Sequence, residues 1–165
     1  MAKGTVKITA EKGGLGMTIE RDVDAPRDIV FRAFTDKDLY SQWIGPRGLS
    51  TDIETFDART GGSYRYIQKD KDGTTYAFHG VFHDVSAPER LVQTFEYEGL
   101  PEPGHASLES MRFEELPGNR TRLVGTSVFL TVEDRDGMMQ SGMEEGMESS
   151  YSRLDELMEK MKIKR

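Results

Sequence analysis

Helical segments near the two ends of the chain flank a continuous run of predicted strands, and this order constrains the fold more than any other feature. Residues 24–47 (DAPRDIVFRAFTDKDLYSQWIGPR) predict a short helix and then a second short helix that ends at Trp-Ile-Gly-Pro. Residues 136–161 predict one long amphipathic helix, because their apolar side chains recur on one face. The order predicts an α+β fold, in which a curved antiparallel sheet carries the long C-terminal helix across its open face. Such a sheet does not close its own mouth, so we expect a cavity under the helix.

The middle of the chain alternates apolar and polar side chains as half-buried strands do. The expected strands are 5–10, 17–23, 51–57, 62–69, 74–86, 90–98, 106–116 and 121–130. Turn-forming residues at 71–73 (KDG) and 117–119 (PGN) predict tight hairpins between strands. The sequence contains no internal repeat, low-complexity tract or linker, so residues 1–165 are expected to form a single domain.

Capping residues and glycines mark the expected limits of the helices. Asp24 or Ala25 is expected to cap the first helix, and Asp36 to cap a second helix over residues 37–43. Gly142 and Gly146 lie inside the predicted long helix, where each costs about 1 kcal/mol relative to alanine. Either a close approach of the helix to the sheet or room left for a ligand would explain that cost.

Composition excludes several classes of partner and chemistry. The formal net charge of −7 argues against nucleic acid and against an anionic membrane surface as partners. Cysteine is absent, which excludes disulfides, thiolate zinc sites and a cysteine nucleophile. The sequence has no apolar run of the roughly 18 residues that a membrane span needs, and its start has no secretory pattern. We therefore expect a cytoplasmic protein.

Aromatic and methionine side chains share faces on the predicted strands and on the last helix. The residues expected to line the cavity and bind a ligand are Trp43, Tyr64, Tyr66, Phe78, Phe82, Phe95, Tyr97, Met111, Phe113, Met139, Met143, Met147 and Tyr151. Such walls suit a small hydrophobic or aromatic molecule held by a few polar contacts. The alternative is an ordinary packed core, in which the same side chains fill each other's gaps.

Titratable residues give little indication of catalysis or of metal binding. His79 and His83 share a strand face but lie about 13 Å apart, too far to chelate one ion, so no metal and no cofactor is expected. Asp57 and Arg59 are expected to form a local ion pair that shapes a turn. Glu109 and Arg112 fall on opposite faces of one strand, so one of them is expected to point inward as a polar anchor. No nucleophile elbow or phosphate-binding loop is present, and no catalytic residue is assigned.

Five blocks of the sequence resemble, in order, those of the AHSA-type family, named after the activator of the heat-shock-protein-90 ATPase. The blocks are DAPRDIVFRAFTD, QWIGPRG, FDARTGGSYRY, DGTTYAFHGVFHDVSAPERLVQTFEY and GMEEGMESSYSRLDELMEK. The resemblance implies the helix-grip fold of the SRPBCC superfamily, also called START-like or birch-pollen-allergen-like. Many members carry Trp-Trp-Gly-Pro and Gly-Trp where this chain has Trp43-Ile44-Gly45-Pro46 and Gly146-Met147.

The resemblance leaves three kinds of activity open, because members of this superfamily carry lipids, cyclise polyketides or assist chaperones. We expect binding or sequestration of a small hydrophobic ligand in the cavity, with no cofactor. One alternative is a co-chaperone or stress-response module that binds a chaperone. Another is a cyclase or hydrolase that uses the same cavity and needs a buried ionisable group there. A monomer and a homodimer are both compatible with the sequence.

Overall fold

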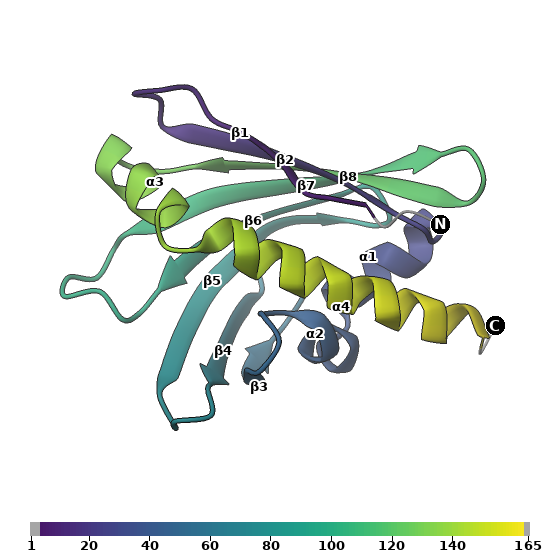
Figure 1. The fold of residues 1–165 in the computed structure, drawn as a ribbon, viewed down its shortest axis with the longest axis horizontal. Helices are drawn as coiled ribbons and strands as arrows, with labels where there is room; N and C mark the ends of the chain where they lie inside the picture. Colours follow the sequence, from purple (N-terminus) through teal and green to yellow (C-terminus); the bar gives the residue numbers. More distant parts are fainter. Residues whose placement is uncertain (1–3, 164–165) are drawn as a thin grey trace.

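The computed structural model describes residues 4–163 and has an eight-stranded antiparallel sheet with α-helices on one face (Figure 1). The strand order across the sheet is β1-β2-β8-β7-β6-β5-β4-β3. The strands are β1 (Lys7–Thr9), β2 (Gly16–Val23), β3 (Ser50–Phe56), β4 (Ser63–Lys69), β5 (Thr75–Ser86), β6 (Arg90–Tyr97), β7 (Ala106–Leu116) and β8 (Arg120–Val128). The helices are α1 (Arg27–Thr35), α2 (Lys37–Trp43), α3 (Val132–Met139) and α4 (Met143–Ile163). The predicted α+β fold, with a curved antiparallel sheet, is confirmed.

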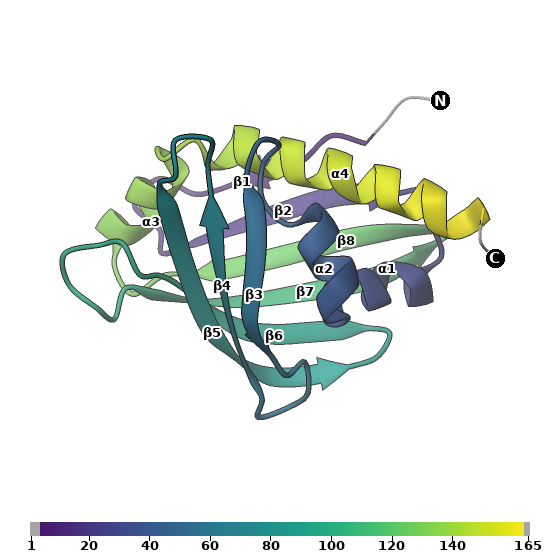
Figure 2. The same cartoon turned by 90° about the horizontal axis from the view of Figure 1, so that it is seen from below.

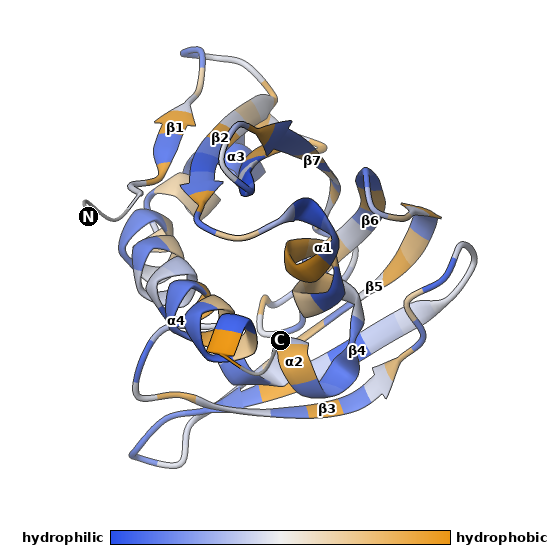
Figure 3. Ribbon diagram, turned by 90° about the vertical axis from the view of Figure 1, so that its right-hand side faces the viewer, coloured by the Kyte–Doolittle hydropathy of each residue, from blue (hydrophilic) through white to orange (hydrophobic). Residues whose placement is uncertain are grey.

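The sheet curves around its helices, and α4 lies across the concave face (Figures 1 and 2). The short helices α1 and α2 sit between α4 and the sheet, where α1 contacts β7 and β8 and α2 contacts β3 and α4 (Figure 3). Helix α1 is apolar around much of its surface because it is enclosed on several sides (Figure 3). The two short helices thereby fill one end of the grip and leave the other end to side chains from the sheet and α4.

The predicted single helix over residues 136–161 is wrong in its first part. Helix α3 begins earlier, at Val132, where Thr131 accepts a hydrogen bond from the Asp134 amide at 3.0 Å. The chain then breaks between α3 and α4, because Gly142 adopts a left-handed conformation with φ of 83°. A residue with a side chain is strained in that conformation, and glycine is not.

The expected cap of α1 is also corrected, whereas that of α2 is confirmed. Pro26, rather than Asp24 or Ala25, occupies the cap position, with an extended backbone whose carbonyl accepts from the Val30 amide at 3.1 Å. At α2 the Asp36 carboxylate accepts from the Leu39 amide at 3.0 Å.

Gly80 allows a close approach between β5 and β6, and the register of this strand pair shifts further along, between Phe82 and Asp84. The ladder between β5 and β6 is interrupted after His79, and the Val81 amide donates to the Thr94 hydroxyl instead, at 2.9 Å. A Cβ atom on Gly80 would collide with the Thr94 carbonyl oxygen, so only glycine allows the two strands to approach this closely.

Polar contacts attach α4 to the rest of the molecule. The buried Arg21 guanidinium on β2 donates to both carboxylate oxygens of Asp155, at 2.6 and 2.8 Å. Ser150 accepts from the Gly45 amide at 3.0 Å and donates to the Trp43 carbonyl at 2.9 Å. These bonds tie the helix both to the sheet and to the turn that follows α2.

The buried apolar residues form two clusters that meet at the centre of the grip. The larger cluster joins α1 and α4 to the sheet and includes Phe113, Leu123 and Leu154. The smaller one comprises Ile53, Tyr64, Tyr66 and Phe82 on β3, β4 and β5. The fully buried part of α4 begins at Ser150 and extends to Met158, and in the first two turns the partly buried Met147 packs against the larger cluster.

Candidate ligand-binding cavity

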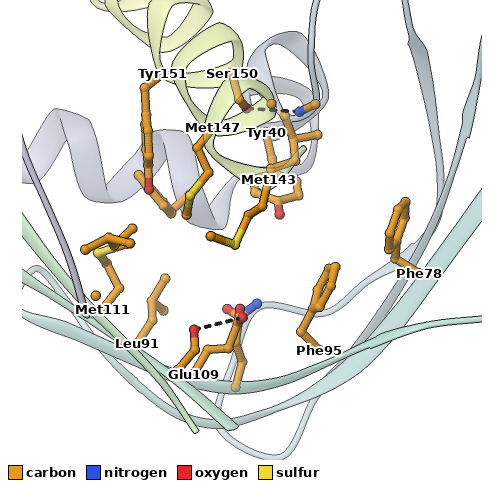
Figure 4. A pocket seen from close by; sticks show the side chains of 18 of the residues that line it. Tyr40, Phe78, Leu91, Phe95, Glu109, Met111, Met143, Met147, Ser150 and Tyr151 are labelled. Atoms are coloured by element: carbon orange, nitrogen blue, oxygen red, sulfur yellow. Dashed lines mark hydrogen bonds between the residues drawn. The ribbon is translucent and has the colours of Figure 1, made fainter. Parts of the chain in front are cut away.

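A cavity of about 320 Å³ lies between the concave face of the sheet and helices α2 and α4 (Figure 4). Its walls include residues from both apolar clusters, among them Ile19, Trp43 and Tyr66. The cavity lies under α4 because the sheet curves and the helix that crosses it does not follow that curvature. A space therefore remains between the sheet and the first turns of α4. A pocket thus lies where the sequence placed the cavity, and its role as a hydrophobic ligand cavity stays a prediction.

Most of the residues that the sequence suggested are brought together around this space. Those that line it are Trp43, Tyr64, Tyr66, Phe78, Phe82, Phe95, Met111, Met143, Met147 and Tyr151. Their role in binding a ligand stays a prediction.

The three remaining candidates, Tyr97, Phe113 and Met139, do not line the cavity. Phe113 is buried beneath α1, with ring centroids 5.0 Å from Phe31 and 5.1 Å from Phe34. Tyr97 packs against Phe78 near the end of β6, with centroids 5.4 Å apart. Met139 lies at the end of α3 and is 36% exposed, because the break before α4 turns it away and places Met138 at the cavity instead.

One wall of the cavity is aromatic. Tyr66 and Phe78 have ring centroids 5.2 Å apart, and Phe78 stacks on Phe95 at 5.3 Å. Tyr40 on α2 stacks on Phe56 at 5.2 Å and extends this wall to the helices. Sequence reasoning missed Tyr40 and Phe56, although Tyr40 precedes Trp43 by three residues and therefore shares its helix face.

The roof is formed by the first turns of α4. Met143, Met147 and Tyr151 point from the helix into the cavity (Figure 4). The Tyr151 ring stacks on Trp43, with centroids 5.9 Å apart and planes at 20°. Gly146 also lines the cavity, and a Cβ atom added there would meet no atom within 4 Å. Of the two explanations for this helical glycine, open space is thus favoured over a close approach to the sheet.

A polar row crosses the floor of the cavity. Gln93 on β6, Glu109 on β7 and Ser127 on β8 are neighbours in register across three strands. The hydroxyls of Ser127 and Ser107 donate to Oε2 of Glu109 at 3.2 and 3.3 Å. Gln93 donates to the hydroxyl of Tyr64 at 3.3 Å. The rest of the floor is largely apolar, so this row concentrates the polar groups at its centre.

Glu109 is the inward member of the pair that the sequence left undecided. Its carboxylate faces the cavity, whereas the Arg112 side chain is 59% exposed and lies 3.5 Å from Glu114 on the outer face. A signal for this was present in the sequence, because Glu109 has the same parity on its strand as the apolar Met111 and Phe113.

Burial raises the pKa of the Glu109 carboxyl above its usual range, and hydrogen bonds from Ser127 and Ser107 lower it and so limit the rise. Burial is also the main cause that raises the pKa of each cavity tyrosine, and the Glu109 carboxylate adds to the rise in all of them. These tyrosines are Tyr40, Tyr64, Tyr66 and Tyr151. A carboxylate that acts on tyrosines from α2, β4 and α4 lies at the centre of the site.

The remaining titratable candidates lie outside the cavity. His79 interacts with Glu98 at 2.8 Å on the outer face of the sheet, and Arg59 pairs with Asp57 at 2.9 Å as predicted. Within residues 4–163 no group of three histidine, cysteine, aspartate or glutamate side chains is placed to hold a metal ion.

A known protein family matches most of the chain. Residues 24–159 match the model of the family described as "Activator of Hsp90 ATPase homolog 1-like protein". The chain belongs to this family. The match includes α1, α2 and most of α4, and hence almost the whole cavity wall.

Solved structures with the same fold come from several bacteria. A protein from Arthrobacter aurescens superimposes with a TM-score of 0.83 at 25% identity, over 93% of this chain and 91% of its own. A protein from Rhodobacter sphaeroides gives 0.80 at 25% identity, over 90% and 95% of the two chains. One from Staphylococcus epidermidis gives 0.77 at 26% identity, over 93% and 94%. These relatives support the helix-grip fold of the activator-like family over nearly the whole chain.

No curated protein sequence matches the chain. Among the helices within residues 4–163, none combines the length and apolar character that a membrane crossing requires. The cytoplasmic location and the choice between monomer and homodimer stay predictions.

Proposed function

We propose that this member of the activator-like family binds a small hydrophobic or aromatic molecule in the cavity under α4 and sequesters or carries it. The observation that supports the proposal most directly is the apolar cavity of about 320 Å³, whose walls come from the sheet, α2 and α4. A ligand that enters it loses apolar surface to the protein, which contributes about 25 cal/mol per Å². Met143 and Met147 at the roof suit this role, because thioether side chains adapt to ligands of irregular shape.

Gly146 offers a way to fill the cavity without removing any packed side chain. The variant Gly146→Phe is expected to keep the fold, since open space lies beside Gly146, and to weaken binding of 1-naphthalenemethanol at least about tenfold. Gly146→Ala is the matched control: it makes the same change in the helix backbone but leaves most of the cavity open. Isothermal titration calorimetry measures both affinities, and native mass spectrometry of protein from its own host identifies any retained molecule.

The wild-type protein is expected to bind at least one neutral aromatic compound in the cavity. A wild-type protein that retains no molecule and binds no member of a panel of neutral aromatic compounds contradicts it. Equal affinity in the wild type and Gly146→Phe contradicts the position of the site.

A second candidate is interaction with a chaperone, which the family description favours. Leu108 and Val128 are neighbours in register on the outer face of the sheet and are 50% and 46% exposed. Binding of Hsp90 that is lost in Leu108→Asp but kept in Gly146→Phe supports this candidate over the cavity.

An enzymatic role as a cyclase or hydrolase is the third candidate, and Glu109 is the buried ionisable group that it requires. The partners of Glu109 within residues 4–163 are two serine hydroxyls. In that case Glu109→Gln abolishes turnover and spares binding of the substrate.

A further inference from the structure

The carboxylate of Glu109 is enclosed in the cavity without a cationic partner. Among residues 4–163, no lysine, arginine or histidine forms an ion pair with it, and both of its hydrogen bonds come from neutral serine hydroxyls. The buried Arg21 on β2 is bound to Asp155 in a bidentate pair. A buried carboxylate is costly unless a positive charge or several hydrogen bonds compensate it, and here the compensation is incomplete.

The hydrogen bonds of Glu109 leave one side of the carboxylate available. Within residues 4–163 both serine hydroxyls donate to the same oxygen, Oε2, so Oε1 can accept from a molecule in the cavity. Ser107 and Ser127 fix the orientation of the carboxylate, because they approach from β7 itself and from the adjacent strand β8. Oε1 of Glu109 is therefore oriented to accept a hydrogen bond from a donor in the cavity.

The other groups that face Glu109 favour a cation over an anion. The titratable side chains around it are the tyrosines Tyr40 on α2, Tyr64 and Tyr66 on β4, and Tyr151 on α4, all neutral at pH 7. From β6 the facing polar group is the neutral amide of Gln93. Aromatic rings attract cations through their negative faces, and the net charge of −7 attracts cations to the protein from a distance.

We propose that the cavity selects an amine: the protonated nitrogen of the ligand pairs with the carboxylate of Glu109, and its apolar part packs against Tyr66, Phe78 and Phe95. This inference rests on the proposed ligand-binding function and specifies its ligand class. The ion pair is protected from water by the roof of α4, which strengthens its attraction relative to a pair on the surface. The amine also supplies the positive charge that residues 4–163 leave absent around Glu109.

The test compares two probes that differ in one group, 1-naphthylmethylamine and 1-naphthalenemethanol. At pH 7 the wild-type protein is expected to bind the amine at least about tenfold more tightly than the alcohol in calorimetric titrations. In Glu109→Gln the amine is expected to lose that advantage, whereas the alcohol binds as before, because glutamine keeps the shape and the hydrogen-bond acceptor but not the charge. Glu115→Gln is the control on the same strand, since the Glu115 side chain is 73% exposed.

Failure of this inference can be separated from failure of the proposed function. If the alcohol binds as tightly as the amine and neither depends on the charge of Glu109, the cavity binds ligands but does not select amines. If both probes weaken equally in Glu109→Gln, Glu109 accepts a hydrogen bond from neutral donors and the amine preference is wrong. If the wild type binds neither probe, nor any other compound in a neutral aromatic panel, the proposed function itself is wrong.

The pH dependence of the unmodified protein provides a second measurement that needs no variant. As the pH falls and Glu109 becomes protonated, the affinity for the amine is expected to decrease while the affinity for the alcohol stays constant. An amine affinity that is independent of pH between 7 and the acid limit of folding overturns the inference, even if Glu109→Gln does not fold.

Discussion

The carboxylate of Glu109 couples its own ionisation to folding, because it is enclosed among apolar side chains and held by two serines. Its raised pKa means that the folded protein holds the proton more tightly than the unfolded chain does. The corresponding stabilisation is complete below the pKa of the unfolded chain and is lost as the pH rises through the raised pKa of the folded protein.

We therefore expect Glu109→Gln to gain stability relative to the wild type as the pH rises from acid to neutral, with a plateau above the pKa of Glu109. Urea unfolding at a series of pH values measures the difference in the free energy of unfolding. Glu115→Gln, at a side chain that is 73% exposed on the same strand, is the matched control for the substitution itself. A constant difference across the pH series would mean that Glu109 titrates alike in the folded and unfolded states.

For individual residues, the sequence predicted correctly which side chains share a strand face. It predicted less well which of those side chains line the cavity. Strand alternation placed Tyr64 with Tyr66 and Met111 with Phe113, and these pairs do share a face. It did not show that α1 covers Phe113, because that depends on how a helix packs against the sheet.

Among the elements, α2 and α4 are joined by a buried hydroxyl on α4 as well as by the bonds from Arg153 to backbone carbonyls at the end of α2. Ser150 satisfies both the Gly45 amide and the Trp43 carbonyl at the end of α2. We expect Ser150→Ala to lower the free energy of unfolding by about 1–3 kcal/mol, since it leaves two backbone groups without this partner. Chemical denaturation with tryptophan fluorescence follows the change, because Trp43 is the single tryptophan and lies at this contact.

Ser149→Ala is the matched control for this prediction. Ser149 accepts a hydrogen bond from the Arg47 amide at 2.8 Å at an exposed position, where water can replace the lost partner. Its effect is expected to be about 0.5 kcal/mol or less. Equal losses in the two variants would show that Ser150 holds α2 no more firmly than an exposed serine does.

Element order and most strand limits followed from periodicity and turn residues, but the break between α3 and α4 did not. Met139, Met143 and Met147 continue at a spacing of four residues through the break, so the apolar pattern gives no sign of it. Gly142 and Gly146 are equivalent in the local sequence, yet only Gly142 adopts a positive φ. The bond that attaches α3 to β2, from Arg135 to the Gly16 carbonyl at 2.9 Å, joins residues 119 positions apart and likewise has no sign in the local sequence.

For the whole molecule, the buried ion pair of Arg21 and Asp155 attaches α4 to the sheet in addition to the larger apolar cluster. The side chain of Arg21 is 2% exposed and that of Asp155 is 18% exposed. We expect Asp155→Asn to lower the free energy of unfolding by about 3 kcal/mol or more, because it leaves a buried guanidinium without its counterion. Urea unfolding at neutral pH measures the loss.

Two further variants test the reason for that loss. The double variant Arg21→Met with Asp155→Leu is expected to regain most of the stability, because apolar side chains of similar size can replace a buried ion pair. Glu156→Gln, which removes an exposed contact to Arg47, is expected to cost no more than about 1 kcal/mol. A double variant as unstable as Asp155→Asn would assign the loss to packing rather than to charge.

The overall architecture could be predicted because the order of helix, sheet and helix admits few arrangements with one core. The volume of the cavity could not, because it depends on the difference between side-chain sizes across two curved layers. Gly146 on the roof and Gly80 on β5 both affect that difference, one by a missing side chain and the other by the close approach of β5 to β6.

The two halves of α4 have different roles, and this difference affects how ligand specificity can change among related proteins. The part from Ser150 to Met158 is buried and bonded to the sheet and α2, whereas Met143, Gly146 and Met147 face the cavity. Substitutions at Met143 and Gly146, which belong to neither buried cluster, can therefore alter the shape of the cavity at little expense to folding. During evolution, related proteins can therefore acquire new ligands through changes at the start of α4 while the second half of the helix maintains the fold. The start of α4 is accordingly the position of choice for redesigning specificity.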